Sequence, residues 1–434
     1  MISYGSAAEA ADLLTSWRAA CSYDANYSAA GNALSAGLEK SKQGDSMILP
    51  QIALTANLDQ TKQSIQPGDP STASTVAQGL QYGSGISLVQ PLYDASAFAN
   101  RKELKIQAQE ARVQYRFAEQ DLILRIAKAY FEVLLAQDKV NLTKAQIDAV
   151  GQQLAQAKKT FSVGSATITD TNEAQSRFDA IVADEISARN DLDLKQAAYH
   201  QLTNLDPLTL VPISETRKPI PPEPAVIDPW LAQARSDSLT VIAQKMGLQI
   251  SNSEIERYRL GSSPTLALVA RFETQWDGST SSDPGLPDRT SNNTIGLQLT
   301  IPLYTGGYRS SKYREAVSLA AQQRDALEAI VREAQQTTRQ SFLGVKTGAA
   351  QIKALEQAKV SSVSSVASSK MGRDVGVRTT IDVLNAEQVH YQNLYNLAVA
   401  KYQYLLSRLQ LAASVGKLNE SELENVNSWL VTGM

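Results

Sequence analysis

The residues that most often do chemistry in proteins are scarce in this chain of 434 residues, and they are not grouped. The two histidines, His200 and His390, stand far apart, and neither has the spacing to His, Cys or Asp that a metal site requires. The single cysteine, Cys21, has no recognisable partner for nucleophilic catalysis and can form no intramolecular disulfide. We therefore expect no enzyme activity, no metal and no cofactor.

A short motif of glycine, threonine and aspartate occurs twice and is the clearest candidate for a functional site. Residues 163–170 read VGSATITD and residues 375–382 read VGVRTTID, so both fit V-G-x-x-T-x-x-D. The glycine can take the positive φ with which many helices end, and the threonine and aspartate have the spacing of a capping box. The motif predicts a helix–turn–helix connection formed by Val163, Gly164, Thr167 and Asp170 in the first copy and by Val375, Gly376, Thr379 and Asp382 in the second.

Further matches in the same order indicate that the chain is a tandem duplication. The glycines of the two motifs are 376 − 164 = 212 residues apart, and the prolines of two PLY segments, Pro91 and Pro302, are 302 − 91 = 211 apart. Residues 49–58 and 263–272 form a third matching pair. The connector at 203–235 is too rich in proline to be one continuous helix.

Each repeat is therefore expected to hold two strands, a long helix, a tip turn and a return helix. In repeat 1, residues 1–210, we place these at about 48–60, 78–91, 95–161, 163–170 and 171–203. In repeat 2, residues 236–434, we place them at about 264–276, 293–303, 308–371, 373–382 and 383–414, followed by a C-terminal equatorial segment at 415–434. Each long helix would span about 100 Å and needs partners along its whole length.

The four predicted strands alternate apolar and polar residues. Leu297 and Leu299, for example, alternate with Gln298 and Thr300. Strands of about ten residues suit a tilted crossing of a bilayer. Four strands cannot close a transmembrane barrel, so two or three copies of the chain would have to share one, with eight or twelve strands. Two hairpins of a soluble antiparallel sheet are the alternative.

Composition and the chain ends narrow the class of protein. Charged residues make up 20 % and the formal net charge is −3, which gives no reason to expect a nucleic-acid partner. No stretch approaches the ~18 consecutive apolar residues of a transmembrane helix. The start lacks the pattern of a signal peptide, so we expect either a cytosolic protein or a mature chain whose signal has been removed. Polar loops at 60–75 and 277–293 fit the exterior face of a barrel.

These features together resemble the TolC family of outer-membrane channel proteins. The resemblance is most specific in FSVGSATITDTNEAQSRFDAIVADEISARNDLD, which begins at Phe161, and in VGVRTTIDVLNAEQVHYQNL, which begins at Val375. It implies a mixed α and β membrane protein with a tandem duplicated repeat. Three chains would form a 12-stranded outer-membrane β-barrel continued by a long α-helical periplasmic barrel.

The same resemblance implies a function. The chain would be a passive exit duct for type I secretion, drug efflux or both, in the outer membrane of a Gram-negative bacterium and extending into the periplasm. Its partners would be a periplasmic adaptor (membrane fusion) protein and an inner-membrane ABC or proton-driven transporter. The residues alone leave one alternative, a soluble or surface-exposed coiled-coil structural or interaction protein with no transport role.

Roles for residues of the pore entrance also follow from the resemblance. Asp382 would contribute one carboxylate to a three-fold ring at the entrance, which would favour cations. Asn385 stands where the family usually has a second aspartate, so a doubled acidic ring is not expected. The glycine, valine and threonine residues of the two motifs would form the tip turns and dock the adaptor.

A gate latch is implied in the same way. Arg378 matches an arginine that holds the entrance shut, and Thr169 and Asp170 match its partners in the first tip. Arg373 replaces a tyrosine of the same latch, and we expect a salt bridge there in place of that tyrosine's hydrogen bond. Exposed ion pairs contribute only ~0–1 kcal/mol each, so a latch requires several copies.

Overall fold

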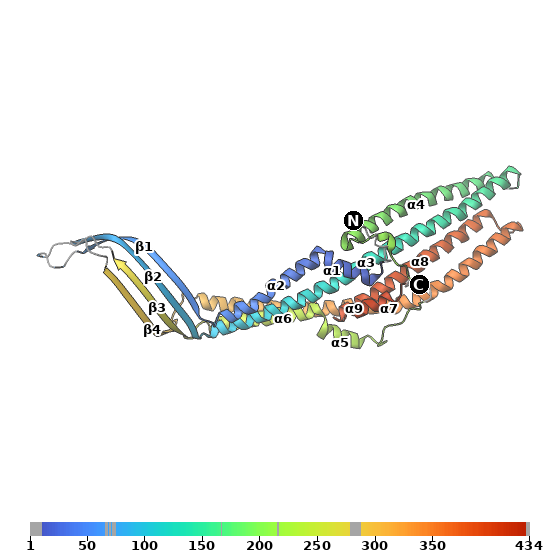
Figure 1. The fold of residues 1–434 in the computed structure, drawn as a ribbon. Helices are drawn as coiled ribbons and strands as arrows, with labels where there is room; N and C mark the ends of the chain where they lie inside the picture. The colour runs from blue at the N-terminus through green and yellow to red at the C-terminus, as the bar shows by residue number, and fades with distance from the viewer. Residues whose placement is uncertain are drawn as a thin grey trace. The chain divides into compact units, whose positions relative to one another are not determined.

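The structure, a computed structural model, describes residues 11–65, 68, 71, 75–165, 167–214, 217–277 and 288–430. Residues 1–10 and parts of the predicted loops, first tip, connector and C-terminal segment lie outside the described residues. The chain divides into two compact units, whose elements are drawn in Figure 1. Unit 1 comprises Met1–Ala33, Val113–Ala243 and Glu328–Met434, and unit 2 comprises Leu34–Arg112 and Gln244–Leu327.

Unit 2 contains a four-stranded antiparallel sheet in the order β1-β2-β3-β4. The strands are β1 (Gln51–Ile65), β2 (Thr75–Tyr93), β3 (Thr265–Asp277) and β4 (Asp288–Thr300). The pairing of β2 with β3 joins the hairpins of the two repeats in one sheet.

The register of the sheet places the predicted apolar residues on one face. Ile52, Leu88, Ala270 and Ile295 lie opposite one another across all four strands. At the two edges, Ile52 and Ile295 are 69 % and 70 % exposed in the single chain. The alternation predicted from the sequence is confirmed, and large apolar side chains on this face are exposed in the single chain.

The strand bounds differ from the expected ones. β4 ends at Thr300 rather than at 303, because Pro302 has no N–H with which to continue the ladder. β1 continues to Ile65 and β2 begins at Thr75, so both strands reach into the segment expected to be a loop at 60–75. The hydrogen-bonded pairing of β1 with β2 therefore continues beyond the alternating apolar residues of both strands, as far as Ile65 and Thr75.

Four helices run from one unit into the other. They are α2 (Ala25–Ser46), α3 (Ala95–Ser162), α6 (Leu239–Leu260) and α7 (Tyr308–Asp374). Small residues allow close contact: a Cβ added to Gly37 of α2 would lie 2.3 Å from the Cβ of Ala111 of α3. Within the described ranges, no helix combines the length and the apolar character needed to cross a membrane.

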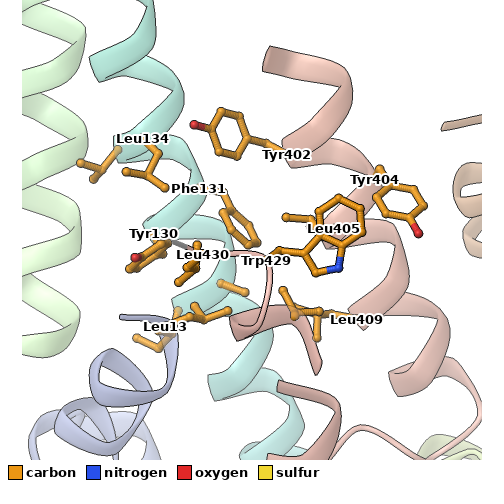
Figure 2. Close-up of a cluster of buried hydrophobic side chains, with 14 of the residues drawn as sticks. Leu13, Tyr130, Phe131, Leu134, Tyr402, Tyr404, Leu405, Leu409, Trp429 and Leu430 are labelled. Atoms are coloured by element: carbon orange, nitrogen blue, oxygen red, sulfur yellow. The ribbon is translucent and has the colours of Figure 1, made fainter. Parts of the chain in front are cut away.

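Unit 1 holds the main hydrophobic core. Its remaining helices are α1 (Leu13–Tyr23), α4 (Ile168–Thr203), η1 (Pro207–Thr209), α5 (Asp228–Asp237), α8 (Thr380–Ser414) and α9 (Glu420–Asn427). Figure 2 shows Phe131 of α3 and Leu405 of α8 pointing toward a common interior, with Trp429 and Leu430 of the C-terminal segment beside them. The fully buried Tyr130 packs edge-on against Phe131.

The two ends of the described chain are tied together in unit 1. The side-chain oxygen of Asn427, the last residue of α9, accepts hydrogen bonds from the backbone N–H groups of Leu13 and Leu14 at 2.9 and 3.3 Å. The Asn427 amide also donates to Asp12, the N-cap of α1, at 2.8 Å. The start of α1 is thus capped by a residue 414 positions away.

Candidate functional site: the two tip turns

The candidate site consists of the turns that join α3 to α4 and α7 to α8, which lie at the same end of unit 1 (Figure 1). The first turn ends α3 with Gly164 at φ 76°. The Gly164 N–H donates to the carbonyl of Phe161, and the Ser165 N–H donates to that of Thr160, both at 2.9 Å. This pair of bonds is the Schellman arrangement, which occupies carbonyls that a helix end leaves free.

The second turn has the same geometry. Gly376 has φ 80°, and its N–H donates to the carbonyl of Arg373 at 2.9 Å. The Val377 N–H donates to the carbonyl of Gly372, also at 2.9 Å. The positive φ predicted for both motif glycines is confirmed.

A capping box starts the following helix in both turns. The Thr167 hydroxyl accepts from the Asp170 N–H at 3.2 Å, and the Asp170 carboxylate accepts from the Thr167 N–H at 3.1 Å. The corresponding distances between Thr379 and Asp382 are 3.1 and 2.8 Å. The structural part of the motif prediction is therefore confirmed in both copies, whereas docking of an adaptor stays a prediction.

Apolar side chains around both turns are exposed. Val163 and Ile168 beside the first turn are 68 % and 52 % exposed, and Val375 and Val377 beside the second are 70 % and 75 % exposed. Exposed valine and isoleucine side chains on two similar turns form a surface suited to apolar contact with a partner.

Asp382 has one carboxylate oxygen in the capping box and the other near a cation. Hydrogen bonds from the backbone and side chain of Thr379 hold the pKa of Asp382 below its usual value, and the nearby charge of Arg378 lowers it further. The Arg378 Nη1 lies 3.8 Å from Oδ1 of Asp382. The carboxylate is therefore ionised at neutral pH, as a charged ring at an entrance would require.

The expected latch residues are not joined within the single chain. Among the described residues, no hydrogen bond or ion pair links Arg378 to Thr169 or Asp170. The Arg378 side chain instead folds over Gly372, where an added Cβ would lie 2.7 Å from Cγ of Arg378. Because only one chain is described, the latch of Arg378 with Thr169 and Asp170 stays a prediction.

Arg373 and Asn385 contact other helices of the same chain. Arg373 forms an ion pair with Asp374 and donates through Nη1 to Oε1 of Gln153 on α3, and its role in the latch stays a prediction. Asn385 accepts a hydrogen bond from Arg177 of α4 at 2.8 Å. Both side chains reach helices of repeat 1, because the last turn of α7 lies beside α3 and the first turns of α8 lie beside α4.

Sequence reasoning missed several residues of this region. Arg177 donates to Gln388 at 2.7 Å as well as to Asn385, and Glu387 is buried between α3, α7 and α8. One signal was present in the sequence: Arg177 follows Asp170 by seven residues, which places it on the same face of α4 two turns later. Its partners on α8, Asn385 and Gln388, are 208 and 211 residues away in the sequence. The sequence does not indicate them, because they depend on how the two helices pack.

The histidine near the second tip has a packing role. Its Nδ1 lies 2.9 Å from the Ser362 hydroxyl on α7. Burial lowers the pKa of His390, and the positive charge of Lys359 lowers it further, so the ring is neutral at pH 7. In the part of the chain that the structure describes, no group of three or more His, Cys, Asp or Glu residues is arranged to hold a metal ion.

Comparison with known proteins connects both repeats to one family. The sequence model of the family described as "Outer membrane efflux protein" matches residues 24–205 and 230–417. The chain is 32 % identical over 397 residues to the outer membrane protein TolC of Vibrio cholerae, covering 91 % of this chain and 88 % of that protein. It is 29 % identical over 433 residues to the proteases secretion protein PrtF of Dickeya chrysanthemi, covering 98 % and 92 %.

A solved structure has the same fold. The outer membrane protein VceC of Vibrio cholerae superimposes with a TM-score of 0.79, covering 93 % of this chain and 96 % of that one, at 15 % sequence identity. The mixed α and β channel fold with a duplicated repeat, expected from the sequence, is thereby confirmed.

Proposed function

Because the chain belongs to the outer membrane efflux protein family, we propose that it is a passive exit duct in the outer membrane of a Gram-negative bacterium. The single observation that carries this proposal is the match of the family to both repeats, residues 24–205 and 230–417. Two relatives named for protease secretion support export of proteins, and one relative named as an efflux protein supports a role in efflux. Family membership argues against the alternative of a coiled-coil spacer without a transport role.

The sheet supports assembly of the duct from several copies. Within the described chain, β1 and β4 each pair on one side only, so the sheet has two free edges. Lipid does not tolerate unpaired strand edges, because backbone amides there have no water with which to form hydrogen bonds. Pairing β4 of one copy with β1 of the next would close a barrel, and three copies of the four strands would give twelve.

The tips support a gate operated by partners. Two similar turns with exposed valine side chains would dock a periplasmic adaptor, and an inner-membrane ABC or proton-driven transporter would supply the energy for opening. Arg378, Thr169 and Asp170 would form the latch between copies, because each of these side chains is exposed or half-buried at a turn. Asp382 would supply the carboxylate ring at the entrance.

The two equivalent aspartates provide a matched test of the entrance. Asp382→Asn is expected to lower the preference of the open pore for cations several-fold, because it removes the charge that the ring contributes. Asp170→Asn makes the same change in the first capping box, where the amide oxygen can still accept from the Thr167 N–H; it can affect the latch and so the size of the conductance, but it should leave the selectivity unchanged. Reversal potentials measured in planar bilayers under a salt gradient compare the two. Equal reversal potentials for the two variants would show that Asp382 does not set the cation preference of the entrance.

A further inference from the structure

A groove in unit 2 lies close to the sheet and is separate from the tip turns. It runs between the first turns of α3 and the last turns of α6 and has a volume of about 660 Å³. Four residues on one face of α3 line it: Phe98, Arg101, Lys102 and Lys105. Among the described residues of the lining, Glu256 of α6 is the one acidic residue. The groove is therefore positively charged, although the whole chain carries a formal net charge of −3.

The ion pairs of the groove do not neutralise its cations. Nε of Arg101 lies 2.7 Å and Nζ of Lys105 lies 3.0 Å from the same oxygen, Oδ1 of Asp45 on α2. Lys102 is paired more loosely, with 3.6 Å between its Nζ and Oε2 of Glu256, and its side chain is 62 % exposed. Two cations thus share one carboxylate. An anion that enters the groove is attracted by all three cations and does not have to separate a buried ion pair.

The groove lies at the level where a membrane ends when the sheet spans the apolar layer. β2 ends at Tyr93 and α3 begins at Ala95. Arg101 follows Ala95 by six residues, which is about 9 Å along a helix. The headgroup layer extends about 5–7 Å beyond the hydrocarbon on each side of a bilayer. Because the long side chains of arginine and lysine extend along a helix toward the headgroups, the cations of the groove reach the level of the lipid phosphates.

An exposed aromatic side chain indicates the kind of anion. Phe98 lies at the end of the groove nearest the sheet and is 46 % exposed. An inorganic anion would leave this ring in water, whereas a phospholipid would bring an acyl chain against it. Arg259, three residues after Glu256 on α6, is exposed, forms no ion pair within the described chain and adds a cation one turn nearer the sheet. Charge and apolar contact together fit an amphipathic anion.

We propose that this groove binds the phosphate of an anionic phospholipid in the periplasmic leaflet of the outer membrane. Arg101, Lys102 and Lys105 hold the phosphate, and Phe98 contacts the first carbons of an acyl chain. A lipid held there joins α3 of repeat 1 to α6 of repeat 2 at the edge of the membrane. The inference rests on the proposed place of the chain in the outer membrane and does not depend on conduction.

Lipid binding to the full-length protein in detergent micelles tests the site. With phosphatidylglycerol and phosphatidylcholine offered at equal concentrations, native mass spectrometry is expected to show about tenfold more bound phosphatidylglycerol, because only this lipid carries a net negative charge. Lys102→Gln combined with Lys105→Gln should reduce the preference several-fold, and Lys102→Arg combined with Lys105→Arg should retain it. The matched control is Lys128→Gln combined with Lys144→Gln, which removes the same charge from exposed positions of α3 in unit 1 and should change nothing.

The outcomes separate the groove from general charge attraction and from the duct. A preference that is equally strong in both glutamine variants, or equally weakened in both, would overturn the site, because neither result depends on the groove. Release of the bound lipid by an equal concentration of inorganic phosphate would also overturn it, since the groove would then hold a free anion. A protein that prefers phosphatidylglycerol through the groove but forms no pores in a planar bilayer would retain the lipid site and count against the duct.

Discussion

Replacing Gly416 with alanine is expected to destabilise unit 1 by about 4 kcal/mol, which is a large effect for one added methyl group. Gly416 ends α8 at φ 70°, and an added Cβ would lie 2.2 Å from the backbone oxygen of Asp237 and 3.1 Å from its carbonyl carbon. Both atoms belong to the main chain at the end of α5, so no side-chain rotation can relieve the overlap. The junction between α8 and the α5–α6 connection must shift instead.

Gly164→Ala is the matched control for this substitution. Gly164 ends α3 with the same pair of hydrogen bonds and φ 76°, but nothing lies within 4 Å of its added Cβ. Only the left-handed conformation then opposes alanine, at about 1 kcal/mol. Thermal unfolding of the two variants, followed by circular dichroism, should show a much larger loss of stability for Gly416→Ala than for Gly164→Ala. Equal losses would mean that the close approach to Asp237 does not exist.

Leu405→Ala is expected to cost about 3 kcal/mol of stability, the second large effect. Leu405 is fully buried on α8 in the core that α1, α3 and α9 share, and Figure 2 shows it beside Trp429. Truncation removes buried apolar contacts and leaves a cavity that neighbouring rings fill only in part.

The control for the core substitution is Leu208→Ala. Leu208 lies in η1 of the same unit and is 77 % exposed, so its truncation should change stability by less than about 0.5 kcal/mol. Denaturant unfolding, followed through the helices of unit 1, measures the free energy of unfolding of both variants. A Leu405→Ala variant as stable as the Leu208→Ala variant would contradict the placement of α8 in the core.

Local signals made the turns and the strand faces predictable from the sequence. Gly164 and Gly376 permit the positive φ, and Thr167 and Thr379 stand three residues before an aspartate, so each turn is encoded within eight residues. The apolar face of the sheet follows from alternation alone, because side chains of a strand point to opposite faces in turn.

Contacts between distant helices could not be predicted in the same way. The guanidinium of Arg373 contacts Gln153, 220 residues away, and its contribution to a latch stays a prediction. The side chain of Asn385 accepts from Arg177, a pairing fixed by how α4 and α8 lie against each other, and its place at the pore entrance stays a prediction. The capping of α1 by Asn427 depends likewise on the packing of the chain ends. None of these pairs has a signature within one stretch of sequence.

Single-channel recording tests the central claim most directly. The full-length protein, purified in detergent and added to a planar lipid bilayer, is expected to produce discrete, cation-preferring conductance steps. These steps should be small in the unmodified protein and larger in an Arg378→Ser variant, because we propose that Arg378 holds the entrance shut. A folded protein that is recovered with outer membranes but produces no conductance step in either form would contradict the account of this chain as an exit duct.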